Sequence, residues 1–368
     1  MSGPVFFFAG GGTGGHLYPG LAVAGEVQRL RPDATIVFAC SSRDIDRRIL
    51  DPLDYAVVPQ PVRPMPRGLR GWGSFLLAWR RSALLAADMV RDLRPQAVLG
   101  LGGYAAAPLV RRASAKGIRA GMLNPDAVPG IANRLLARHT DAIFAQFAST
   151  ADAFPARCRG KVRHTGCPVR RELLGASRDE ALKHFDLDGA RRTLLVFGAS
   201  LGAASINMAV AALAGEMERF ADSWQVLHVT GQSKIDSVTA PGARLRVRTV
   251  DYCHRMDLAY AAADLALCRS GASTIAELTA TGTPAVLMPY PHHRDRQQYL
   301  NAQQLVQAGA ALVVDDRIEP AANVAQLRGT LLALMDDPAR LAALHAAARA
   351  QPGQAAAGEI ANWLCGGG

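Results

Sequence analysis

The chain has no apolar run approaching the roughly 20 residues that a membrane-spanning helix needs. Its six cysteines are scattered and form no Cys-X-X-Cys pair, which predicts free thiols in a reducing cytoplasm. The apolar run Val5–Phe8 has no charged region before it and glycines after it, so we expect no secretory signal peptide. These features favour a protein that works inside the cell without crossing the membrane.

The composition is that of a globular protein. A length of 368 residues suggests two domains of ordinary size. Hydrophobic residues make up 49% and charged residues 20%, so each domain can form its own core and disorder is expected only at the ends.

The net charge of +10 is unevenly distributed. Residues 1–170 contain 23 Lys and Arg against 11 Asp and Glu, whereas the remainder contains 18 against 20. The basic half therefore predicts an anionic partner, either nucleic acid or an acidic membrane surface. A genome that favours arginine codons would explain the choice of Arg over Lys, but it would not explain this asymmetry.

Both halves alternate short apolar strands with amphipathic helices, which predicts parallel sheets with helices on both faces. Each half has a glycine-rich strand-to-helix junction, at Val5–Gly15 and at Leu194–Ala203. Helices are expected over 19–30 and 205–214 and through the Ala-rich tail 323–364. Ligands of such sheets bind at the carboxyl ends of the strands. The pattern breaks near Thr165–Arg171. The expected strands are 35–39, 97–101, 142–145, 225–229, 265–268 and 284–288.

The most informative segment is Cys268–Asn301. Small residues follow a predicted strand and lead into a helix, where uncovered N–H groups bind anions. Glu277 lies in the first turns of that helix, within reach of a ribose. A second strand brings the amides of Gln297 and Gln298 to the same edge, and neutral donors and acceptors suit a sugar. An ordinary crossover would explain the glycine but not this run of polar side chains.

This segment resembles the donor-nucleotide site of nucleotide-sugar glycosyltransferases, and in particular the MurG family of N-acetylglucosaminyltransferases. The resemblance spans nearly the whole chain. It implies the GT-B fold, with two Rossmann-like doubly wound domains facing a cleft and a C-terminal helix crossing back. The implied domains are 1–165 for acceptor and membrane, 166–345 for the UDP-sugar donor, and 346–368 for the returning helix. The implied donor-binding residues are Thr13, Gly14, Gly15, Asp126, Arg170, Ser200, Cys253, Arg269, Ala272, Ser273, Thr274, Ile275, Ala276, Glu277, Gln297 and Gln298.

The segment Gly10–Gly20 resembles the family's first glycine-rich loop, in which glycines allow close approach of a phosphate. His16 is the side chain there that titrates near neutral pH, so it is the candidate general base. A helix-capping histidine without a chemical role is the alternative. The implied acceptor-binding residues are Gly12, His16, Gly102, Gly103, Tyr104 and Asn133, and for Gly102–Tyr104 the alternative is a tight turn.

The segment Arg63–Arg81 carries five arginines and no acidic residue, interleaved with large apolar side chains. Arginines reach lipid phosphates while tryptophans lie at the headgroup level, so we predict an anionic membrane surface as partner. A helix that packs its apolar face inward is the alternative, and no nucleic-acid-binding motif is present. The predicted membrane residues are Trp72, Phe75, Leu76, Trp79 and Arg80.

Two Asp-X-Asp spacings, Asp44 with Asp46 and Asp186 with Asp188, are interpreted as solvated turns, and no metal site is expected. Two positions depart from the family. Leu201 replaces a glutamine, and Leu123–Asp126 reads LNPD where the family has HEQN or LEQN. Asp126 thus stands where an asparagine would face the donor sugar, and an ionised carboxylate cannot donate a hydrogen bond.

The implied function is an inverting transfer of N-acetylglucosamine from UDP to the 4-hydroxyl of the muramyl sugar on a polyprenyl-linked acceptor, lipid I. It would take place on the cytoplasmic face of the inner membrane, with UDP-N-acetylglucosamine as substrate and no resident cofactor. Three alternatives remain open: a related transferase with another UDP-sugar or a diacylglycerol or natural-product acceptor, a UDP-sugar epimerase on the same scaffold, and a lipid-surface binding module without activity.

Overall fold

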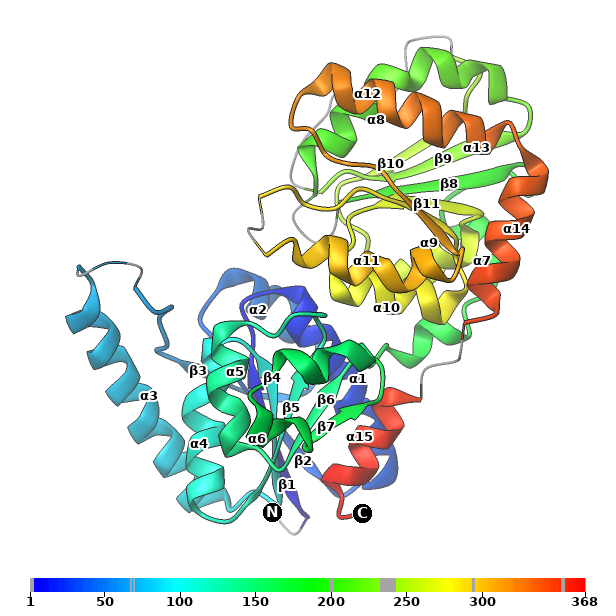
Figure 1. The fold of residues 1–368 in the computed structure, drawn as a ribbon. Helices are drawn as coiled ribbons and strands as arrows, with labels where there is room; N and C mark the ends of the chain where they lie inside the picture. Colours follow the sequence, from blue (N-terminus) through cyan, green and yellow to red (C-terminus); the bar gives the residue numbers. More distant parts are fainter. Residues whose placement is uncertain are drawn as a thin grey trace. The chain divides into compact units, whose positions relative to one another are not determined.

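The computed structural model describes residues 3–66, 68, 70–198, 202–231, 243–292, 295–351 and 355–367. The chain divides into two compact units (Figure 1). Unit 1 contains residues Met1–Arg170 and Gln354–Gly368, and unit 2 contains Arg171–Gly353. The division falls close to the predicted boundary between residues 165 and 166.

Unit 1 is built on a seven-stranded parallel sheet with the strand order β3-β2-β1-β4-β5-β6-β7. The central strands β1 and β4 are buried along their whole length, as expected for a parallel sheet covered on both faces. The strands are β1 Val5–Gly10, β2 Thr35–Ser41, β3 Ala56–Gln60, β4 Ala97–Gly102, β5 Arg119–Asn124, β6 Ala142–Ala145 and β7 Val162–His164.

Two hydrophobic clusters cover the faces of this sheet. Val98 and Met122 point into the cluster on the face where α3 and α4 pack. Leu99 and Leu123 point into the cluster on the opposite face, where α1 and α15 pack. The helices are α1 Gly14–Leu30, α2 Asp44–Leu50, α3 Trp72–Leu93, α4 Ala107–Ala115, α5 Ile131–Leu136, α6 Ala156–Arg159 and α15 Ala356–Leu364, with 3₁₀ turns at Tyr104–Ala106, Ala137–His139 and Ala148–Ala153.

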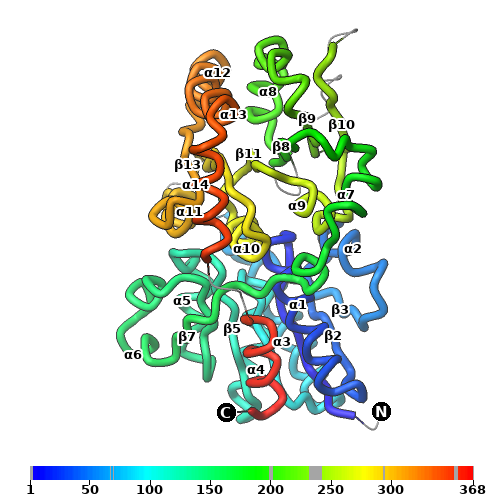
Figure 2. Tube along the Cα trace, turned by 90° about the vertical axis from the view of Figure 1, so that its right-hand side faces the viewer, coloured from blue at the N-terminus to red at the C-terminus, as the bar shows by residue number. Residues whose placement is uncertain are grey.

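The last helix, α15, packs on unit 1 beside α1 as predicted, and both chain ends lie at the same end of this unit (Figure 2). Trp363 is buried, its ring lies 5.3 Å from that of Phe144, and Arg119 lies over it and bonds to its carbonyl. The predicted range 346–368 starts too early, because residues 346–349 belong to α14 of unit 2.

Unit 2 is built on a six-stranded parallel sheet with the order β10-β9-β8-β11-β12-β13. The strands are β8 Arg192–Phe197, β9 Trp224–Val229, β10 Val247–Val250, β11 Leu265–Cys268, β12 Ala285–Leu287 and β13 Ala311–Val313. The helices are α7 Arg178–His184, α8 Ala204–Met217, α9 Met256–Ala262, α10 Ala272–Thr281, α11 Gln297–Gln307, α12 Pro320–Leu327, α13 Ala333–Met335 and α14 Pro338–Arg349, with 3₁₀ turns at Arg171–Leu174 and Glu218–Phe220 and a π turn at Arg328–Leu332.

Both units are therefore doubly wound α/β folds, as predicted. In each sheet the strand order reverses next to the first strand, between β1 and β4 in unit 1 and between β8 and β11 in unit 2. The loops that leave adjacent strands at such a point diverge to opposite faces of the sheet, which opens a crevice for a ligand. Within the described residues, no helix has the length and apolar character needed to cross a membrane.

Candidate functional site

The glycine-rich loop of unit 1 leaves β1 at the point where the strand order reverses. Gly10, Gly11 and Gly12 have φ values of 148°, 149° and 90°, a region that side chains strongly disfavour. Gly20, the seventh residue of α1, packs so close to Leu101 that a Cβ would lie 2.7 Å from the Leu101 methyl groups. The glycines thus form the turn and bring α1 against β4.

His16 lies in the first turn of α1, not in the loop before a later helix. The helix begins at Gly14 although the sequence predicted its start at Pro19. The Nδ1 atom of His16 lies 3.3 Å from the hydroxyl of Thr13. A Cβ on Gly102 would lie 3.1 Å from the ring of His16, so the loop after β4 and the imidazole are in contact. The structure therefore brings together His16, Gly102 and Gly103 within unit 1.

Asp46 corrects the interpretation of the first Asp-X-Asp spacing. Asp44 is exposed, but Asp46 is fully buried. Its Oδ1 accepts a hydrogen bond from the Gly12 N–H at 2.6 Å, and its Oδ2 accepts one from the Ser41 hydroxyl at 2.5 Å. The interpretation as a solvated turn was wrong for Asp46, because a contact distant in sequence buries it.

The second glycine turn of unit 1 is bonded to α5. Gly103 donates its N–H to Oδ1 of Asn133 at 3.3 Å, and the Asn133 amide donates to Oδ1 of Asn124 at 2.9 Å. Asn124 in turn donates to the carbonyl of Asp126 at 2.7 Å. Asn133 is only 7% exposed. The structure thus gives Asn133 a role in shaping the Gly103 turn and the LNPD segment, with Tyr104 beginning the 3₁₀ turn that follows.

Arg170 closes unit 1 and lies over the ring of Tyr18, with its guanidinium carbon 4.6 Å from the ring centroid. Its Nε is buried and has no hydrogen-bond partner among the described residues. The Tyr18 ring that the guanidinium covers lies against Gly14 at the start of α1, so the cation suits the donor-binding role that the family resemblance implied for Arg170.

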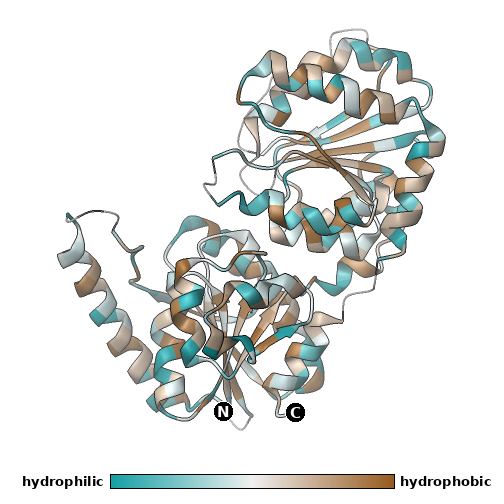
Figure 3. Ribbon diagram, viewed as in Figure 1, coloured by the Kyte–Doolittle hydropathy of each residue, from teal (hydrophilic) through white to brown (hydrophobic). Residues whose placement is uncertain are grey.

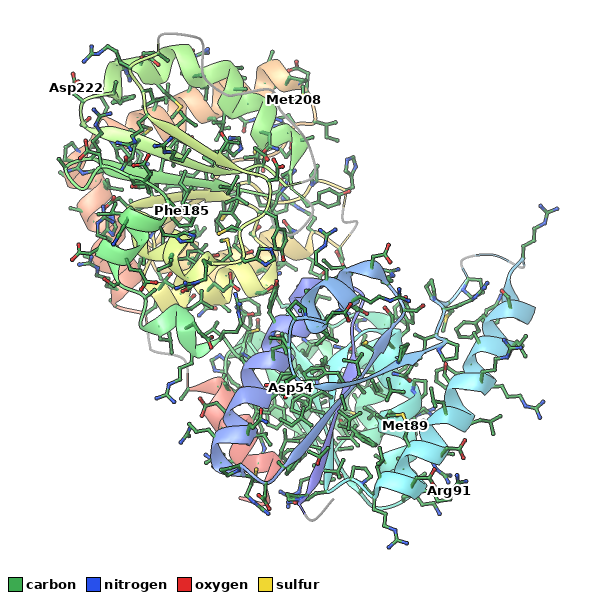
Figure 4. The ribbon with its side chains drawn as sticks, turned by 180° about the vertical axis from the view of Figure 1, so that it is seen from behind. Asp54, Met89, Arg91, Phe185, Met208 and Asp222 are labelled. Carbon is green, nitrogen blue, oxygen red and sulfur yellow. The ribbon has the colours of Figure 1, made fainter. Side chains whose placement is uncertain are left out.

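The predicted membrane residues lie on α3, the long helix at the edge of unit 1 (Figure 1). One face, which includes Met89, is buried, and Arg91 is exposed (both labelled in Figure 4). Hydrophobic and hydrophilic residues alternate along the helix (Figure 3). At its N-terminal end Trp72 and Leu76 remain 41% and 56% exposed.

Phe75, Leu76 and Trp79 line an apolar cavity of about 610 Å³ between α3 and α5, to which α5 contributes the exposed side chains of Ile131 and Leu135. The cavity also contains Arg111, whose guanidinium lies over the Trp79 ring. Arg80 is exposed. The inward-packing alternative therefore describes the second half of α3, whereas the first half keeps its apolar side chains accessible. The α5 contribution was missed because a six-residue helix has too little periodicity to reveal an exposed face.

In unit 2 the loop after β11 is bonded through Arg269. This side chain is 7% exposed and donates to the carbonyls of Met288 and Pro289, to the Ser205 hydroxyl and to Asp316. Burial opposes ionisation of Asp316, but hydrogen bonds from Ser205 and the Ile318 N–H lower its pKa. Arg269 thus connects its own loop to the loops that follow β12 and β13 and to the start of α8. The sequence assigned Arg269 to the donor and gave no signal for Asp316.

The helix α10 begins directly after this loop, with Gly271 as its N-cap and no side-chain cap among the described residues. The N–H groups of its first turn are therefore presented to an anion. Ala272, Thr274, Ile275 and Ala276 are largely buried and Ser273 is half-buried, so their backbone is what a ligand would contact.

Glu277 is half-buried and accepts a hydrogen bond from the Tyr260 hydroxyl at 2.9 Å. Burial raises the pKa of the neighbouring Cys268 thiol, and the charge on Glu277 raises it further, so this cysteine stays protonated. An ionised carboxylate held by a phenol is well suited to accept from the two hydroxyls of a ribose.

Gln297 and Gln298 begin α11, and Oε1 of Gln298 accepts a hydrogen bond from the Tyr290 N–H at 2.8 Å.

Cys253 is half-buried beside Tyr252, whose ring stands edge-on to that of His254. Ser200 and Leu201 lie outside the described residues. Asn207 is buried, its amide donates to the Thr230 carbonyl, and its Oδ1 lies 3.0 Å from Nε2 of His228, so it supports the core of unit 2.

The described residues contain no group of three His, Cys, Asp or Glu that could hold a metal ion. The second Asp-X-Asp spacing is a turn, in which Asp186 pairs with Arg246 and Arg248 and Asp188 accepts from the Ala190 N–H.

Two doubly wound units, with a glycine-rich turn at the switch point of the first and, among the described residues, a helix without a side-chain cap at that of the second, are the architecture of the GT-B class. Residues 6–145 match the glycosyltransferase family 28 N-terminal domain, and residues 193–360 match the family 28 C-terminal domain. The chain belongs to glycosyltransferase family 28.

Relatives with a curated name include proteins of Chlorobaculum tepidum and Desulforudis audaxviator. The first is 39% identical over 359 residues, covering 95% of this chain and 96% of the relative. The second is 36% identical over 354 residues, covering 93% and 92%. Both are named UDP-N-acetylglucosamine–N-acetylmuramyl-(pentapeptide) pyrophosphoryl-undecaprenol N-acetylglucosamine transferase.

Among solved structures, MurG of Acinetobacter baumannii has a TM-score of 0.73 at 23% identity, covering 98% of this chain and 99% of that one. A UDP-N-acetylglucosamine 2-epimerase has a TM-score of 0.66 at 15% identity, covering 99% and 96%. At these identities the likeness concerns the fold alone.

Proposed function

We propose that this protein transfers N-acetylglucosamine from UDP-N-acetylglucosamine to the 4-hydroxyl of a muramyl-pentapeptide that is linked through pyrophosphate to a polyprenyl chain. The proposal is carried by one candidate site in each unit: His16 lies beside a glycine turn in unit 1, and unit 2 has Glu277 and the N-terminus of α10. Full-length similarity to relatives named for this reaction supports it over the alternatives.

The chemistry is an inverting displacement at the anomeric carbon. The acceptor oxygen forms a bond to C1 from the face opposite the diphosphate, and the bond from C1 to the diphosphate oxygen breaks, releasing UDP. His16 accepts the hydroxyl proton at Nε2. In the tautomer this requires, Nδ1 carries a hydrogen and donates it to the Thr13 hydroxyl.

The departing diphosphate gains negative charge, which needs stabilisation where it develops. We assign this role to the α10 N–H groups and to Arg170, with Arg269 holding the surrounding loops in place. Because backbone amides and a guanidinium can supply the positive potential, the reaction is proposed to need no resident metal or other cofactor.

The acceptor is amphiphilic, so the enzyme must meet a membrane surface. We propose that it binds peripherally to the anionic cytoplasmic face of the inner membrane through Trp72, Phe75, Leu76, Trp79 and Arg80. The exposed apolar side chains at the start of α3 and on α5 support this, as does the neighbouring arginine-rich segment.

The direct test is to incubate the purified protein with UDP-N-acetylglucosamine and a soluble lipid I analogue and to identify products by mass. A glycosylated acceptor and free UDP are expected, with no turnover when the acceptor is omitted. Conversion of the UDP-sugar to its 2-epimer without acceptor would instead identify an epimerase, whose fold is similar.

A further inference from the structure

The loop Gly10–Gly12 is bonded to a carboxylate that lies 34 residues further along the chain. Asp46 is the third residue of α2 and is 0% exposed, which is rare for an ionisable side chain unless its oxygens are bonded. Both carboxylate oxygens of Asp46 accept a hydrogen bond, one from the Gly12 N–H at 2.6 Å and the other from the Ser41 hydroxyl at 2.5 Å. Hydrogen bonds to a charged acceptor are about twice as strong as neutral ones.

The fit between the carboxylate and the loop is close. A Cβ on Gly11 would lie 2.5 Å from Oδ2 of Asp46, so this carboxylate and a side chain at that position exclude each other. The same segment also bonds the other peptide group of Gly12, because Nη1 of Arg43 donates to the Gly12 carbonyl at 3.2 Å. Both backbone groups of Gly12 are thus determined by the start of α2.

The hydrogen bond between Asp46 and Gly12 affects the position of His16, because the residues after Gly12 lead directly into the helix turn that carries this histidine. Thr13 and the first turn of α1 come directly after Gly12, and His16 lies in that turn against Gly102 and Gly103. A displaced Gly12 would change the direction in which α1 begins and hence the position of the imidazole. Misplacement of a reacting group by about 1 Å can cost on the order of 100-fold in rate.

The negative charge of Asp46 also affects where a phosphate can bind. The Gly12 N–H is already bonded to a carboxylate, and a phosphate at the same N–H would meet that negative charge at short range. Asp46 therefore keeps a diphosphate away from the Gly12 N–H, in contrast to the acceptor contact that the resemblance implied for Gly12.

We propose that Asp46 is a positioning residue for this reaction, which fixes Gly12 and thereby orients His16. The inference rests on the proposed function. A carboxylate that merely stabilised the fold would affect both substrates and the melting temperature together, whereas a positioning residue affects the acceptor side and the chemical step.

The test compares Asp46→Asn and Asp46→Ala with the matched control Asp44→Asn, which removes an exposed carboxylate of the same helix. For Asp46→Ala we expect kcat to fall about 10–100-fold and the acceptor KM to rise, with UDP affinity by calorimetry within about twofold of the original. Asp46→Asn keeps the shape of the side chain and one acceptor oxygen, so its decrease in kcat should be smaller. Asp44→Asn should behave as the original protein.

A second readout does not depend on turnover. In protein labelled with ¹⁵N-glycine, the strongly hydrogen-bonded Gly12 amide should resonate far downfield and move upfield in both Asp46 variants, but not in Asp44→Asn. Unchanged kcat in Asp46→Ala, or a parallel loss of UDP affinity, would overturn the proposal. If the original protein transfers no sugar, the proposed function fails, and the Gly12 resonance alone then decides whether Asp46 positions the loop.

Discussion

The Tyr260 hydroxyl donates a hydrogen bond of 2.9 Å to Oε2 of Glu277, and this pair joins α9 to α10 at the candidate ribose site. Tyr260 is 2% exposed, and its ring stands edge-on to Phe197 at the end of β8. The phenol is therefore held by the core of unit 2, and it holds the carboxylate in turn.

Removal of this carboxylate should weaken nucleotide binding. Charge-assisted hydrogen bonds contribute about 1.5–3 kcal/mol each, so Glu277→Ala should reduce UDP affinity by roughly tenfold or more. Tyr260→Phe keeps the ring but removes the hydrogen bond that holds the Glu277 carboxylate, so it should reduce UDP affinity severalfold. Isothermal calorimetry with UDP measures both, and an unchanged affinity in Glu277→Ala would refute the ribose assignment.

The general base can be tested separately from nucleotide binding. His16→Ala should lower turnover by about 10²–10⁴-fold, the usual effect of losing a general base, with UDP affinity nearly unchanged. Thr13→Val, which removes the hydroxyl near Nδ1, should have a smaller effect in the same direction. Full turnover of His16→Ala at saturating acceptor would reduce the histidine to a structural role.

Binding to membranes should depend on charge and on α3. Each arginine near an anionic surface contributes about 1 kcal/mol, and salt screens this attraction. Co-sedimentation with acidic vesicles should fall at high salt and in the Trp72→Ser, Trp79→Ser double variant. Met208→Ser, which changes an exposed side chain of α8 in unit 2, is the control (labelled in Figure 4). Equal binding to neutral and acidic vesicles would contradict the peripheral-membrane proposal.

The LNPD segment makes a prediction about the donor. If Asp126 faces the sugar, its ionised carboxylate accepts a hydrogen bond from a hydroxyl and still distinguishes epimers, because a misplaced hydroxyl leaves the charge unpaired. UDP-N-acetylglucosamine should then be preferred over UDP-N-acetylgalactosamine, and Asp126→Asn should be tolerated. A kcat/KM ratio near one, or a preference for UDP-glucose, would reject the donor while leaving the transferase class intact.

The stability of unit 2 should decrease in mild acid because of His228. Burial lowers the pKa of this histidine to about 4, and its Nδ1 has no hydrogen-bond partner among the described residues. The unfolded chain binds the proton near pH 6.5, so the contribution of His228 is fully present above that pH and is lost as the pH falls towards 4.

Between pH 7.5 and 5.5 this linkage should cost about 1 kcal/mol in the free energy of unfolding. Chemical denaturation at the two pH values measures it. His228→Gln retains a donor for Asn207 and should remove this part of the pH dependence, whereas His345→Gln, which replaces a less buried histidine, should remove less. Equal pH dependence in His228→Gln and the original protein would disprove the assignment.

Local pattern was sufficient to predict two parallel sheets with helices on both faces, whereas the GT-B fold came from the family resemblance. The strands Ala142–Ala145 and Leu265–Cys268 have the predicted bounds, because uninterrupted apolar runs between polar residues leave few alternatives. The start of α1 was not predictable in this way. Glycines and Pro19 have low helix propensity, yet packing against Leu101 makes Gly14–Gly20 helical.

The candidate site residues could be proposed from the sequence where they belong to motifs, and not where they depend on contacts distant in sequence. His16, Glu277 and Arg269 follow from the sequence around them. Asp46 bonds to a residue 34 positions away, and Asp316 pairs with Arg269 across unit 2. A polar side chain in a charged segment looks solvated until its partner is known, and no pattern in a single sequence identifies that partner.

The packing of α15 on unit 1 has a consequence for synthesis on the ribosome. Gly121 and Phe144 form the surface that receives Trp363, and they are made long before it. The first unit to emerge is therefore the last to be completed, because its apolar surface stays uncovered while all of unit 2 is translated. A fragment that ends at Arg170 should expose this surface and aggregate, and adding a peptide spanning 355–367 should restore its solubility.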